Sequence, residues 1–310
     1  MSQKTGRKQL TVAKKTPQIW AVVITYHPDW LTHELVQALC KQVGTCVVVD
    51  NGSNAQECAA LHATADNCGA HVLELHENMG IAYAQNIGIE MALRAGATHV
   101  LLSDQDSLPE PDMVAKLCEA MDDTGAIAVG PYIRDENDGG DELVYMDRTW
   151  GPRRATPAEL TKRYVEPAFL LASGCLIDAR CFETVGTMKS EYFIDHVDLE
   201  WCLRARAAGG KLAVTTATTL AHSLGDRTAT VPFRAQPVHV HSPIRNYYLT
   251  RNTILLCKSG LLNKHWIAGY MLWLIKYVGF NLVCAPQRRK RAVFIGRGLI
   301  HGVFNRTGKY

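Results

Sequence analysis

The chain has 310 residues, of which 47% are hydrophobic and 20% are charged, and its formal net charge is +3. These values describe a globular protein long enough to bury a core, and they exclude a disordered or fibrous chain. The mild charge gives no indication of a nucleic-acid partner. Ten cysteines without a Cys-x-x-Cys pair predict reduced thiols and a cytoplasmic location rather than a zinc site.

Residues 1–18 contain five basic residues and no acidic residue. They lack the apolar core of a secretory signal, so we predict a solvated, disordered leader.

Strand and helix patterns alternate from residue 19 to residue 106. Short apolar runs predict buried strands at Ile19–Thr25, Cys46–Asp50, His71–Leu75 and Val100–Asp106. Helical patterns run from Asp29 to about Val43, from Ser53 to about Ala65, and over Gly80–Ala95. This alternation predicts an α/β fold with a mostly parallel sheet covered on both faces.

Polar residues gather where these strands end. They are Thr25, Asp50, Asn51, Asp104 and Asp106. The carboxyl ends of the strands in an open α/β sheet form the edge where ligands bind. Two aspartates with one spacer can hold Mg²⁺ or Mn²⁺ against the phosphate oxygens of a nucleotide-sugar, although a solvated turn is the alternative. A Gly-x-Gly-x-x-Gly motif does not follow the first strand, which disfavours a dehydrogenase.

The second half has weaker patterns. We expect a helix from Asp112 to about Met121 and a strand at Ala126–Gly130. Residues 131–167 form a long aperiodic segment, which we assign to the acceptor side because long loops in compact domains are often functional. Gly174 precedes a further strand and permits close approach of a ligand or a neighbour. Two short strands are expected at Lys211–Val214 and Ala217–Ala221.

Four motifs resemble the inverting glycosyltransferases of family 2, which have the GT-A fold. They are Val-Ile-Thr-Tyr-His-Pro, Val-Val-Asp-Asn-Gly-Ser, Glu-Asn-Met-Gly-Ile-Ala-Tyr-Ala-Gln-Asn-Ile-Gly and Leu-Ser-Asp-Gln-Asp-Ser, in the family's order over residues 19–106. The resemblance continues to about residue 256. The Phe-Ile-Asp-His-Val-Asp-Leu-Glu and Arg-Asn-Tyr-Tyr-Leu-Thr-Arg-Asn runs are most similar to bacterial rhamnosyltransferases, which use dTDP-L-rhamnose.

The resemblance implies donor-binding roles near the strand ends. Asp50 would accept the imide N–H of the base, and Thr25 and Asn51 would line the same pocket. Asn78, Gly80 and Asn86 would lie against the diphosphate and the sugar, at the N-terminus of a helix. An ordinary turn and helix cap is the alternative for residues 78–80.

The resemblance also implies a catalytic base and a metal site. Inverting transfer needs a base for the acceptor hydroxyl, and the family pattern favours Asp198, with Asp195 as the alternative. Acidic residues in a first helical turn are otherwise common. His222 would join Asp104 and Asp106 as a metal ligand. Arg251 lies on a predicted helix, Pro243–Lys258, and could reach phosphate or face solvent.

The C-terminal region is apolar and basic. Trp266–Ala285 contains one charged residue, Lys276, and the basic run Gln287–Arg291 follows it. We predict helices that lie on the inner face of the cytoplasmic membrane, with a core helix or a homodimer interface as alternatives. The chain thus divides into a leader (1–18), a GT-A catalytic domain (19–242) and a C-terminal helical region (243–310).

The predicted protein is a metal-dependent, inverting rhamnosyltransferase. It would move L-rhamnose from dTDP-L-rhamnose to a hydroxyl of a cell-surface glycan, such as lipopolysaccharide, or of a lipid-linked acceptor. Transfer of another dTDP- or UDP-sugar remains possible on this sequence, as does a non-catalytic membrane-bound scaffold. A nucleotidyltransferase is disfavoured because the first strand ends in the glycine-poor Thr25-Tyr26-His27-Pro28.

Overall fold

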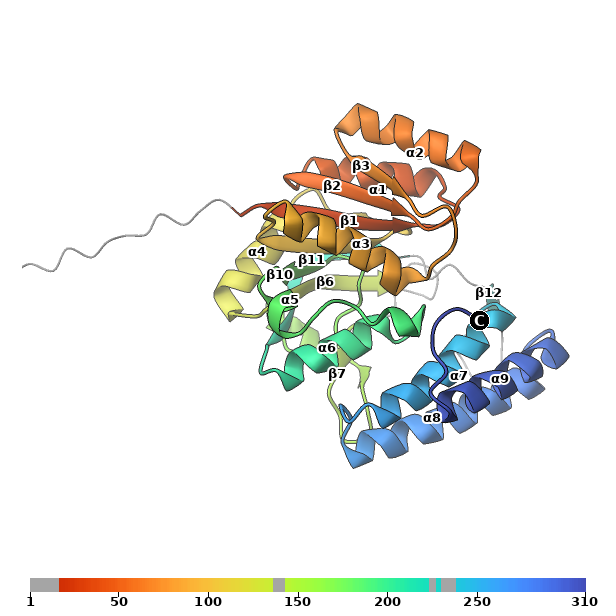
Figure 1. The fold of residues 1–310 in the computed structure, drawn as a ribbon. Coiled ribbons are helices and arrows are strands. Elements are labelled where there is room, and N and C mark those ends of the chain that lie inside the picture. Colours follow the sequence, from red (N-terminus) through yellow and green to blue (C-terminus); the bar gives the residue numbers. More distant parts are fainter. Residues whose placement is uncertain (1–16, 136–142, 223–226, 230–237) are drawn as a thin grey trace, which may run out of the picture.

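The computed structural model describes residues 17–135, 143–222, 227–229 and 238–310 (Figure 1). The strands are β1 (Ile19–Thr25), β2 (Thr45–Asp50), β3 (His71–Glu74), β4 (His99–Asp104), β5 (Ser107–Pro109), β6 (Ala128–Asp135), β7 (Tyr145–Met146), β8 (Arg153–Arg154), β9 (Tyr164–Val165), β10 (Cys175–Asp178), β11 (Leu212–His222), β12 (Arg227–Ala229) and β13 (Val238–Val240). The helices are α1 (Trp30–Cys40), α2 (Ala55–Cys68), α3 (Ile81–Arg94), α4 (Met113–Thr124), η1 (Glu159–Thr161), α5 (Cys181–Thr184), η2 (Ser190–Tyr192), α6 (Val197–Ala207), α7 (Pro243–Lys258), α8 (Lys264–Val283) and α9 (Arg288–Val303).

The central sheet has the strand order β3-β2-β1-β4-β10-β6-β11-β5, and β9 pairs with β11. β1 runs parallel to β2 and β4, and β6 runs parallel to β11. β10 is antiparallel to both of its neighbours, β4 and β6. The predicted α/β fold with a mostly parallel sheet is therefore confirmed, with a reversed strand near the middle of the sheet.

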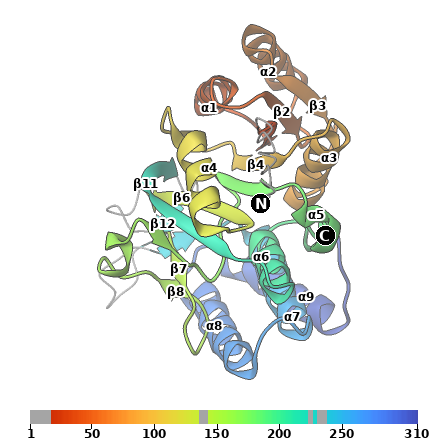
Figure 2. The ribbon, with the colours of Figure 1, turned by 90° about the vertical axis from the view of Figure 1, so that its left-hand side faces the viewer.

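Helices cover both faces of the sheet (Figure 2). Alternate side chains of β1 point to opposite faces, as the period of a strand requires. Val22 and Ile24 pack in one core cluster with apolar residues of α3 and α6, whereas Ala21 and Val23 pack in another with residues of α1 and α4. The continuous apolar sequence of this strand follows from burial on both sides.

Local sequence explains the ends of the first helices. Asp29 caps α1 by accepting hydrogen bonds from the backbone N–H groups of Leu31 and Thr32, and Asn54 caps α2 by accepting from Glu57. β1 and α7 have the predicted bounds. The two strands expected between residues 211 and 221 form one strand, β11, because a register shift between Thr215 and Thr219 absorbs the irregularity.

Other predictions fall partly outside the described residues. The structure does not describe residues 1–16 of the predicted leader. The segment assigned to the acceptor side contains β7, β8, η1 and β9, and residues 136–142 within it lie outside the described part.

The three C-terminal helices lie together beside the sheet domain (Figure 1). α9 packs closely on α7, where an added Cβ at Gly298 would lie 2.5 Å from the carbonyl oxygen of Tyr247, and one at Gly302 would lie 2.9 Å from that of Arg251. Two glycines one helical turn apart therefore let the two backbones meet.

Candidate functional site

The parallel register brings the predicted strand-end residues to one edge of the sheet. Thr25 lies opposite Asp50 on neighbouring strands, and Asp104 lies opposite Ile24. Asn51 directly follows β2. The structure therefore places Thr25, Asp50, Asn51 and Asp104 at one edge, where parallel strands of α/β sheets bind ligands.

The Asp104-Gln105-Asp106 segment is held by contacts on both sides. The Gln105 side chain accepts a hydrogen bond from the Tyr26 backbone N–H at 2.7 Å and donates one to the Tyr26 carbonyl oxygen at 3.1 Å. Ser173 donates its hydroxyl to Asp104 Oδ2 at 2.6 Å. The spacer residue thus fixes this segment against the end of β1, while Ser173 orients the first carboxylate.

Asp104 also has an oxygen that suits a cation. Its Oδ1 is buried and has no hydrogen-bond partner among the described residues. A buried carboxylate oxygen without a donor is costly unless a cation or a ligand approaches it. Carboxylate oxygens are the ligands preferred by Mg²⁺ and also suit Mn²⁺, so the residues present fit a divalent cation.

The structure leaves the third predicted metal ligand undecided. His222 is the last residue of β11 and is paired by backbone register with Ser107, the neighbour of Asp106. Its side chain lies outside the described part of the structure. Among the described residues, no group of three or more His, Cys, Asp or Glu side chains lies close enough to hold a metal ion.

Asp195 and Asp198, the two candidate bases, have different environments. Asp195 is paired with Arg245, with 2.6 Å between Oδ1 and Nη2, and its side chain is only 7% exposed. Asp198 is half-buried at the first turn of α6 and accepts a hydrogen bond from the Leu199 backbone N–H at 2.8 Å. Burial is the largest cause that raises the pKa of Asp198, and together with repulsion from the nearby Asp104 it brings this pKa to about 6. A carboxyl with this pKa accepts a proton readily near neutral pH.

The segment that carries these acids has an unusual backbone. Phe193, Asp195 and His196 all have positive φ angles, of 66°, 65° and 64°. Such angles are unfavourable for residues with a Cβ and persist only when surrounding contacts hold them. We call residues 191–196 the acid loop. It contains Asp195 and leads directly into the first turn of α6, which carries Asp198.

Three successive residues of α7 hold the acid loop. The Asn252 amide donates to the carbonyl oxygens of Tyr192, Ile194 and Asp195 at 2.9, 2.7 and 3.0 Å. Arg251 donates to the carbonyl oxygens of Glu191 and Tyr192. Thr253 Oγ1 lies 2.9 Å from His196 Nε2. Burial lowers the pKa of His196 to about 4, so this ring is neutral at pH 7.

Arg251 is a structural residue in this geometry. It is fully buried, and all five of its N–H groups have acceptors, namely Glu191 O, Tyr192 O, Gly308 O, Asn252 Oδ1 and Tyr247 OH. Its guanidinium also lies 5.1 Å from the ring centres of Tyr247 and Tyr248. The geometry supports neither contact with phosphate nor a solvent-facing role, because the side chain points into the interior.

Asp50 organises the loop after β2. Its two oxygens accept hydrogen bonds from Thr25 Oγ1, from the Ser53 hydroxyl, and from the backbone N–H groups of Gly52 and Ser53. The side chain is completely buried. These donors already occupy the carboxylate, so contact of Asp50 with a nucleobase stays a prediction.

Asn51 and Asn78 connect that loop to the start of α3. Asn51 accepts a hydrogen bond from the Met79 backbone N–H at 2.8 Å, and Asn78 accepts one from the Gly80 N–H at 3.0 Å. Gly80 has a φ of 90°, and a Cβ there would lie 2.6 Å from the Phe193 ring. The glycine therefore lets the acid loop approach the start of α3. The predicted donor-binding residues and the segment with the candidate bases thus lie next to each other.

Asn86 and Gly174 have internal roles in this structure. The Asn86 amide donates to Met188 O and Ser190 Oγ and accepts from the Met188 N–H, so it anchors the segment before the acid loop. A Cβ at Gly174 would lie 2.9 Å from Pro131. The close approach predicted at this glycine comes from the core, and the contacts of both residues with a donor stay predictions.

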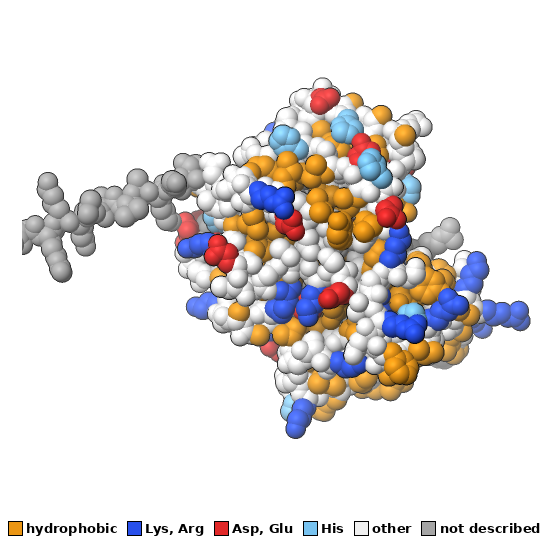
Figure 3. All heavy atoms as spheres, in the orientation of Figure 1, with side chains coloured by type: hydrophobic (Ala, Val, Ile, Leu, Met, Phe, Trp, Pro, Cys, Tyr) orange, Lys and Arg blue, Asp and Glu red, His pale blue; other side chains and the backbone are white. Residues whose placement is uncertain are grey.

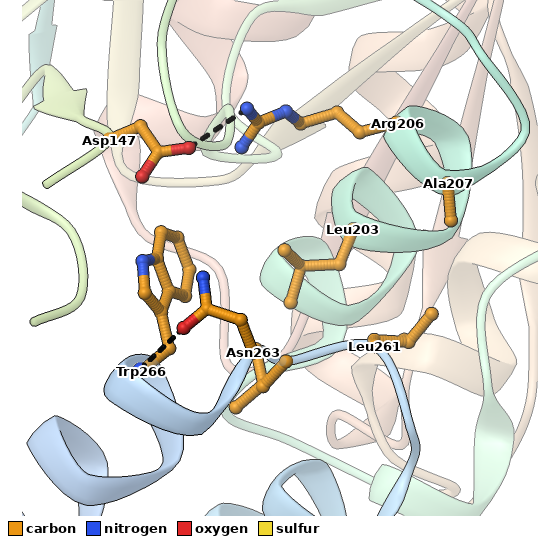
Figure 4. Close-up of a pocket in the computed structure, with 8 residues that line it drawn as sticks. Asp147, Leu203, Arg206, Ala207, Leu261, Asn263 and Trp266 are labelled. Atoms are coloured by element: carbon orange, nitrogen blue, oxygen red, sulfur yellow. Dashed lines mark hydrogen bonds and ion pairs between the residues drawn. The ribbon is translucent and has the colours of Figure 1, made fainter. Parts of the chain in front are cut away.

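A separate pocket of about 310 Å³ lies between the far end of α6 and the start of α8 (Figure 4). Its polar groups are already paired, with Arg206 3.0 Å from Asp147 and with Asn263 capping α8 at the Trp266 N–H. Asp198 and Arg206 are eight positions apart on α6, a distance of about 12 Å along the helix axis. We therefore do not assign this pocket to the reaction.

Sequence reasoning missed the residues that support the site from a distance. Ser173, Arg245 and Asn252 contact Asp104, Asp195 and the acid loop across 50 to 69 positions of sequence. The only indication in the sequence was Ser173, a hydroxyl residue next to Gly174, directly before a predicted strand.

Comparison with solved structures identifies the class of fold. The chain superimposes on GalNAc-T7 crystallised with UDP, GalNAc and Mn²⁺, with a TM-score of 0.60, 14% identity, and coverage of 94% of this chain and 57% of that chain. It also matches S. aureus TarS 1-349 in complex with UDP-GlcNAc, with a TM-score of 0.57, 15% identity, and coverage of 92% of this chain and 81% of that chain. The fold is therefore GT-A-like.

Comparison with protein families gives the finer assignment. The model of Glycosyl transferase family 2 matches residues 20–186. A dTDP-rhamnosyl transferase, RfbF of Shigella flexneri, is 33% identical over 243 residues, which cover 78% of this chain and 80% of that protein. The uncharacterized protein Rv1525 of Mycobacterium tuberculosis is 24% identical over 67% of this chain and 74% of its own length. The chain belongs to glycosyltransferase family 2 and is a glycosyltransferase.

Proposed function

We propose that this protein transfers L-rhamnose from dTDP-L-rhamnose, with inversion, to a hydroxyl of a cell-surface glycan or glycolipid. The observation that carries the reaction is the half-buried Asp198, whose pKa is raised to about 6 beside Asp104 at the strand-end edge. The similarity to RfbF supports the choice of donor. A nucleotide-sugar donor is also consistent with the UDP-GlcNAc bound to the structural neighbour TarS.

In this mechanism Asp198 removes the proton from an acceptor hydroxyl. The acceptor oxygen then forms a bond to the anomeric carbon as the bond from that carbon to the dTDP oxygen breaks on the opposite side. The nucleoside diphosphate leaves with the electron pair. Asp195 does not compete for this role, because its pairing with Arg245 holds it in the acid loop.

Asp104 and Asp106, with His222, would hold a Mg²⁺ or Mn²⁺ ion. The ion, when bound, supplies positive charge for the leaving diphosphate. Ser173 keeps Asp104 oriented toward this position through its 2.6 Å hydrogen bond. The two catalytic tasks are thereby assigned to different parts of the chain, the strand end for the diphosphate and the start of α6 for the acceptor.

Binding of nucleotides tests the donor. We would measure the melting temperature of the protein with dTDP, UDP and GDP, each with and without Mn²⁺, because a ligand that binds only the native state raises its stability. We expect the largest rise with dTDP and Mn²⁺, and a smaller rise in the Asp104→Asn variant. A larger rise with UDP would indicate that the donor is a UDP-sugar. No rise with any nucleotide would favour a non-catalytic scaffold.

Transfer itself is then tested with dTDP-L-rhamnose and candidate acceptors. Release of dTDP that requires an acceptor would support rhamnosyl transfer. Release with a different dTDP- or UDP-sugar, but not with dTDP-L-rhamnose, would retain the transferase and reject the sugar.

A further inference from the structure

The charged residues of the C-terminal helices are all positive. Residues 243–310 contain twelve Lys and Arg residues and no Asp or Glu, although the whole chain has a formal net charge of only +3. Some of these residues act inside the protein. Arg251 holds the acid loop, and Arg291 donates to Asn246, Asn281 and the His241 carbonyl oxygen. Arg288, Arg289 and Lys290 are exposed at the start of α9.

α8 presents an apolar side to solvent. Leu272, Ile275, Leu282 and Val283 are 54%, 68%, 37% and 63% exposed. Their spacing places them along one side of the helix. Trp266, Leu274 and Asn281 of the same helix are buried. α8 therefore buries one side against the protein and leaves apolar side chains on the other.

α9 continues this apolar surface. Val293 and Ile300 of α9, and Phe304 directly after its end, are 54%, 56% and 72% exposed, at a spacing of seven and four residues. Figure 3 shows hydrophobic side chains along the lower right of the molecule, where Figure 1 places α8 and α9, with Lys and Arg side chains at the right-hand end. Exposed apolar area next to a basic cluster is typical of surfaces that bind membranes.

α8 is long and apolar enough to cross a membrane, by length and composition. Its contacts favour a position along the surface. Asn281 lies in the protein interior, where its side chain accepts hydrogen bonds from Asn246 Nδ2 at 2.9 Å and from Arg291 Nη1 at 3.0 Å. Insertion of α8 across a bilayer would separate these buried polar groups from α7 and α9, which is unfavourable.

We propose that the outer face of α8 and α9 docks on a bilayer that contains anionic phospholipids. This face consists of Leu272, Ile275, Leu282, Val283, Val293, Ile300 and Phe304, with Arg288, Arg289 and Lys290 beside them. The basic residues also line an open hollow of about 840 Å³ at the turn between α8 and α9, which offers them to phosphate headgroups. Lys276, exposed within the apolar side, can extend its ammonium to the headgroups.

Charge decides between a bilayer and a second copy of the chain. Two copies that met through this face would bring their basic clusters together, and residues 243–310 contain no acidic side chain to pair with them. Anionic lipid supplies the complementary charge. This proposal concerns a surface outside the acid loop and the strand-end edge, so it can fail without affecting the transferase assignment.

Sedimentation with vesicles tests the proposal. The full chain would be mixed with vesicles of phosphatidylcholine alone or of phosphatidylcholine with phosphatidylglycerol, and the bound fraction measured at low and high salt. We expect binding to the anionic vesicles that weakens with salt. The triple variant Arg288→Glu, Arg289→Glu, Lys290→Glu should bind at least about tenfold more weakly.

Matched variants keep the test specific. Lys41→Glu, Lys162→Glu and Lys211→Glu change the net charge equally at exposed positions outside the three C-terminal helices, and this variant should retain binding. Leu272→Asp with Ile275→Asp should lose binding to anionic vesicles while the basic cluster stays intact. Circular dichroism and the nucleotide-dependent melting temperature confirm that each variant is folded.

Three results would overturn the proposal. They are no binding to anionic vesicles by the native chain, equal loss in the matched Lys variant, and self-association through this face. Light scattering of the native chain and of the Leu272→Asp, Ile275→Asp variant detects the last of these, because a dimer built on the apolar face would dissociate in the variant.

Discussion

Asp198 lies where burial disfavours the charge that its proposed role as a base requires. Burial raises its pKa from 3.8 to about 6. A raised carboxyl pKa means that folding favours the neutral form, so Asp198 contributes most stability below pH 4, and this contribution is lost as the pH rises through 6. At pH 7 the ionised side chain therefore lowers stability, as is common for residues kept for catalysis.

We predict that Asp198→Asn abolishes transfer and stabilises the fold at pH 7. The amide cannot accept the proton, so turnover should fall by at least about 10²-fold. The neutral side chain should add about 1–2 kcal/mol to the free energy of unfolding at pH 7, with the difference shrinking toward pH 4. Denaturant unfolding in the absence of divalent cations measures this, and dTDP binding should persist.

Asp66→Asn is the control, because Asp66 is an exposed carboxylate on α2. It should change neither turnover nor stability measurably. Unchanged turnover in Asp198→Asn would remove Asp198 from the role of base and return Asp195 to consideration.

The same pKa predicts the pH profile of the reaction. Because transfer needs the ionised Asp198, kcat/KM for the acceptor should rise with pH through an apparent pKa of about 6 and level off above pH 7. His196 adds no step in this range, since burial lowers its pKa to about 4. Initial rates from pH 4.5 to pH 8.5 at saturating Mn²⁺ measure the profile, and a rate that does not rise with pH across this range would contradict the assignment.

Residue types at the strand ends could be predicted from sequence, but their partners could not. Thr25, Asp50 and Asp104 follow apolar runs, so their common edge was predictable. The burial of Arg251 was not, because its acceptors Glu191 and Gly308 lie 60 and 57 positions away. The sequence of a helix does not show whether an arginine side chain faces solvent or donates to buried carbonyl groups.

At the scale of elements, α7 supports the candidate site. Its residues 251–253 hold the acid loop by side-chain hydrogen bonds, and Arg245 on its first turn pairs with Asp195. The predicted boundary at residue 243 thus separates a helix from the loop that it fixes. The positive φ angles of that loop are unfavourable, and the hydrogen bonds from α7 stabilise them.

We predict that Asn252→Ala lowers kcat by at least about tenfold and stability by about 2–3 kcal/mol. The substitution removes the donor that serves the carbonyl oxygens of Tyr192, Ile194 and Asp195. Asp198 then loses its fixed position, so kcat should fall more than the KM for the donor rises.

Asn263→Ala is matched to it. This change removes the cap of α8, at a cost of about 1 kcal/mol, without touching the acid loop. Comparable losses of kcat in both variants would indicate that Asn252 acts only through overall stability.

Elements with strong local patterns were predictable, and those defined by distant pairing were not. The apolar run of β1 and the proline at the start of α7 gave bounds that agree with the structure. The reversed direction of β10 depends on pairing with β4 and β6, which sequence does not specify. A helical region was predicted for residues 243–310, but the sequence predicted no bounds for α9, which begins with four basic residues and contains three glycines.

At the scale of the whole molecule, the last residues return to the site. Gly308 accepts a hydrogen bond from Arg251 and donates its N–H to the Glu191 carbonyl oxygen at 2.9 Å. The Tyr310 N–H donates to the Tyr248 hydroxyl. One guanidinium therefore joins the acid loop, α7 and the C-terminal tail.

We predict that deletion of residues 305–310 destabilises the protein and reduces transfer, because Arg251 would keep a buried N–H without its acceptor. The loss should be about 2 kcal/mol or more, measured by thermal unfolding alongside initial rates. Lys309→Ala is the comparison. It removes only the exposed pair with Glu77 and should cost less than about 0.5 kcal/mol. Equal effects of both changes would contradict the importance of the backbone contact.

The contact between Arg251 and Gly308 has a consequence for biosynthesis. A chain grows from its N-terminus, and its earlier domains fold while later residues are still being added. The sheet can assemble early, but the acid loop cannot be fastened in this way until translation has passed Gly308. Nascent chains attached to ribosomes should therefore be able to fold their sheet before they can perform transfer.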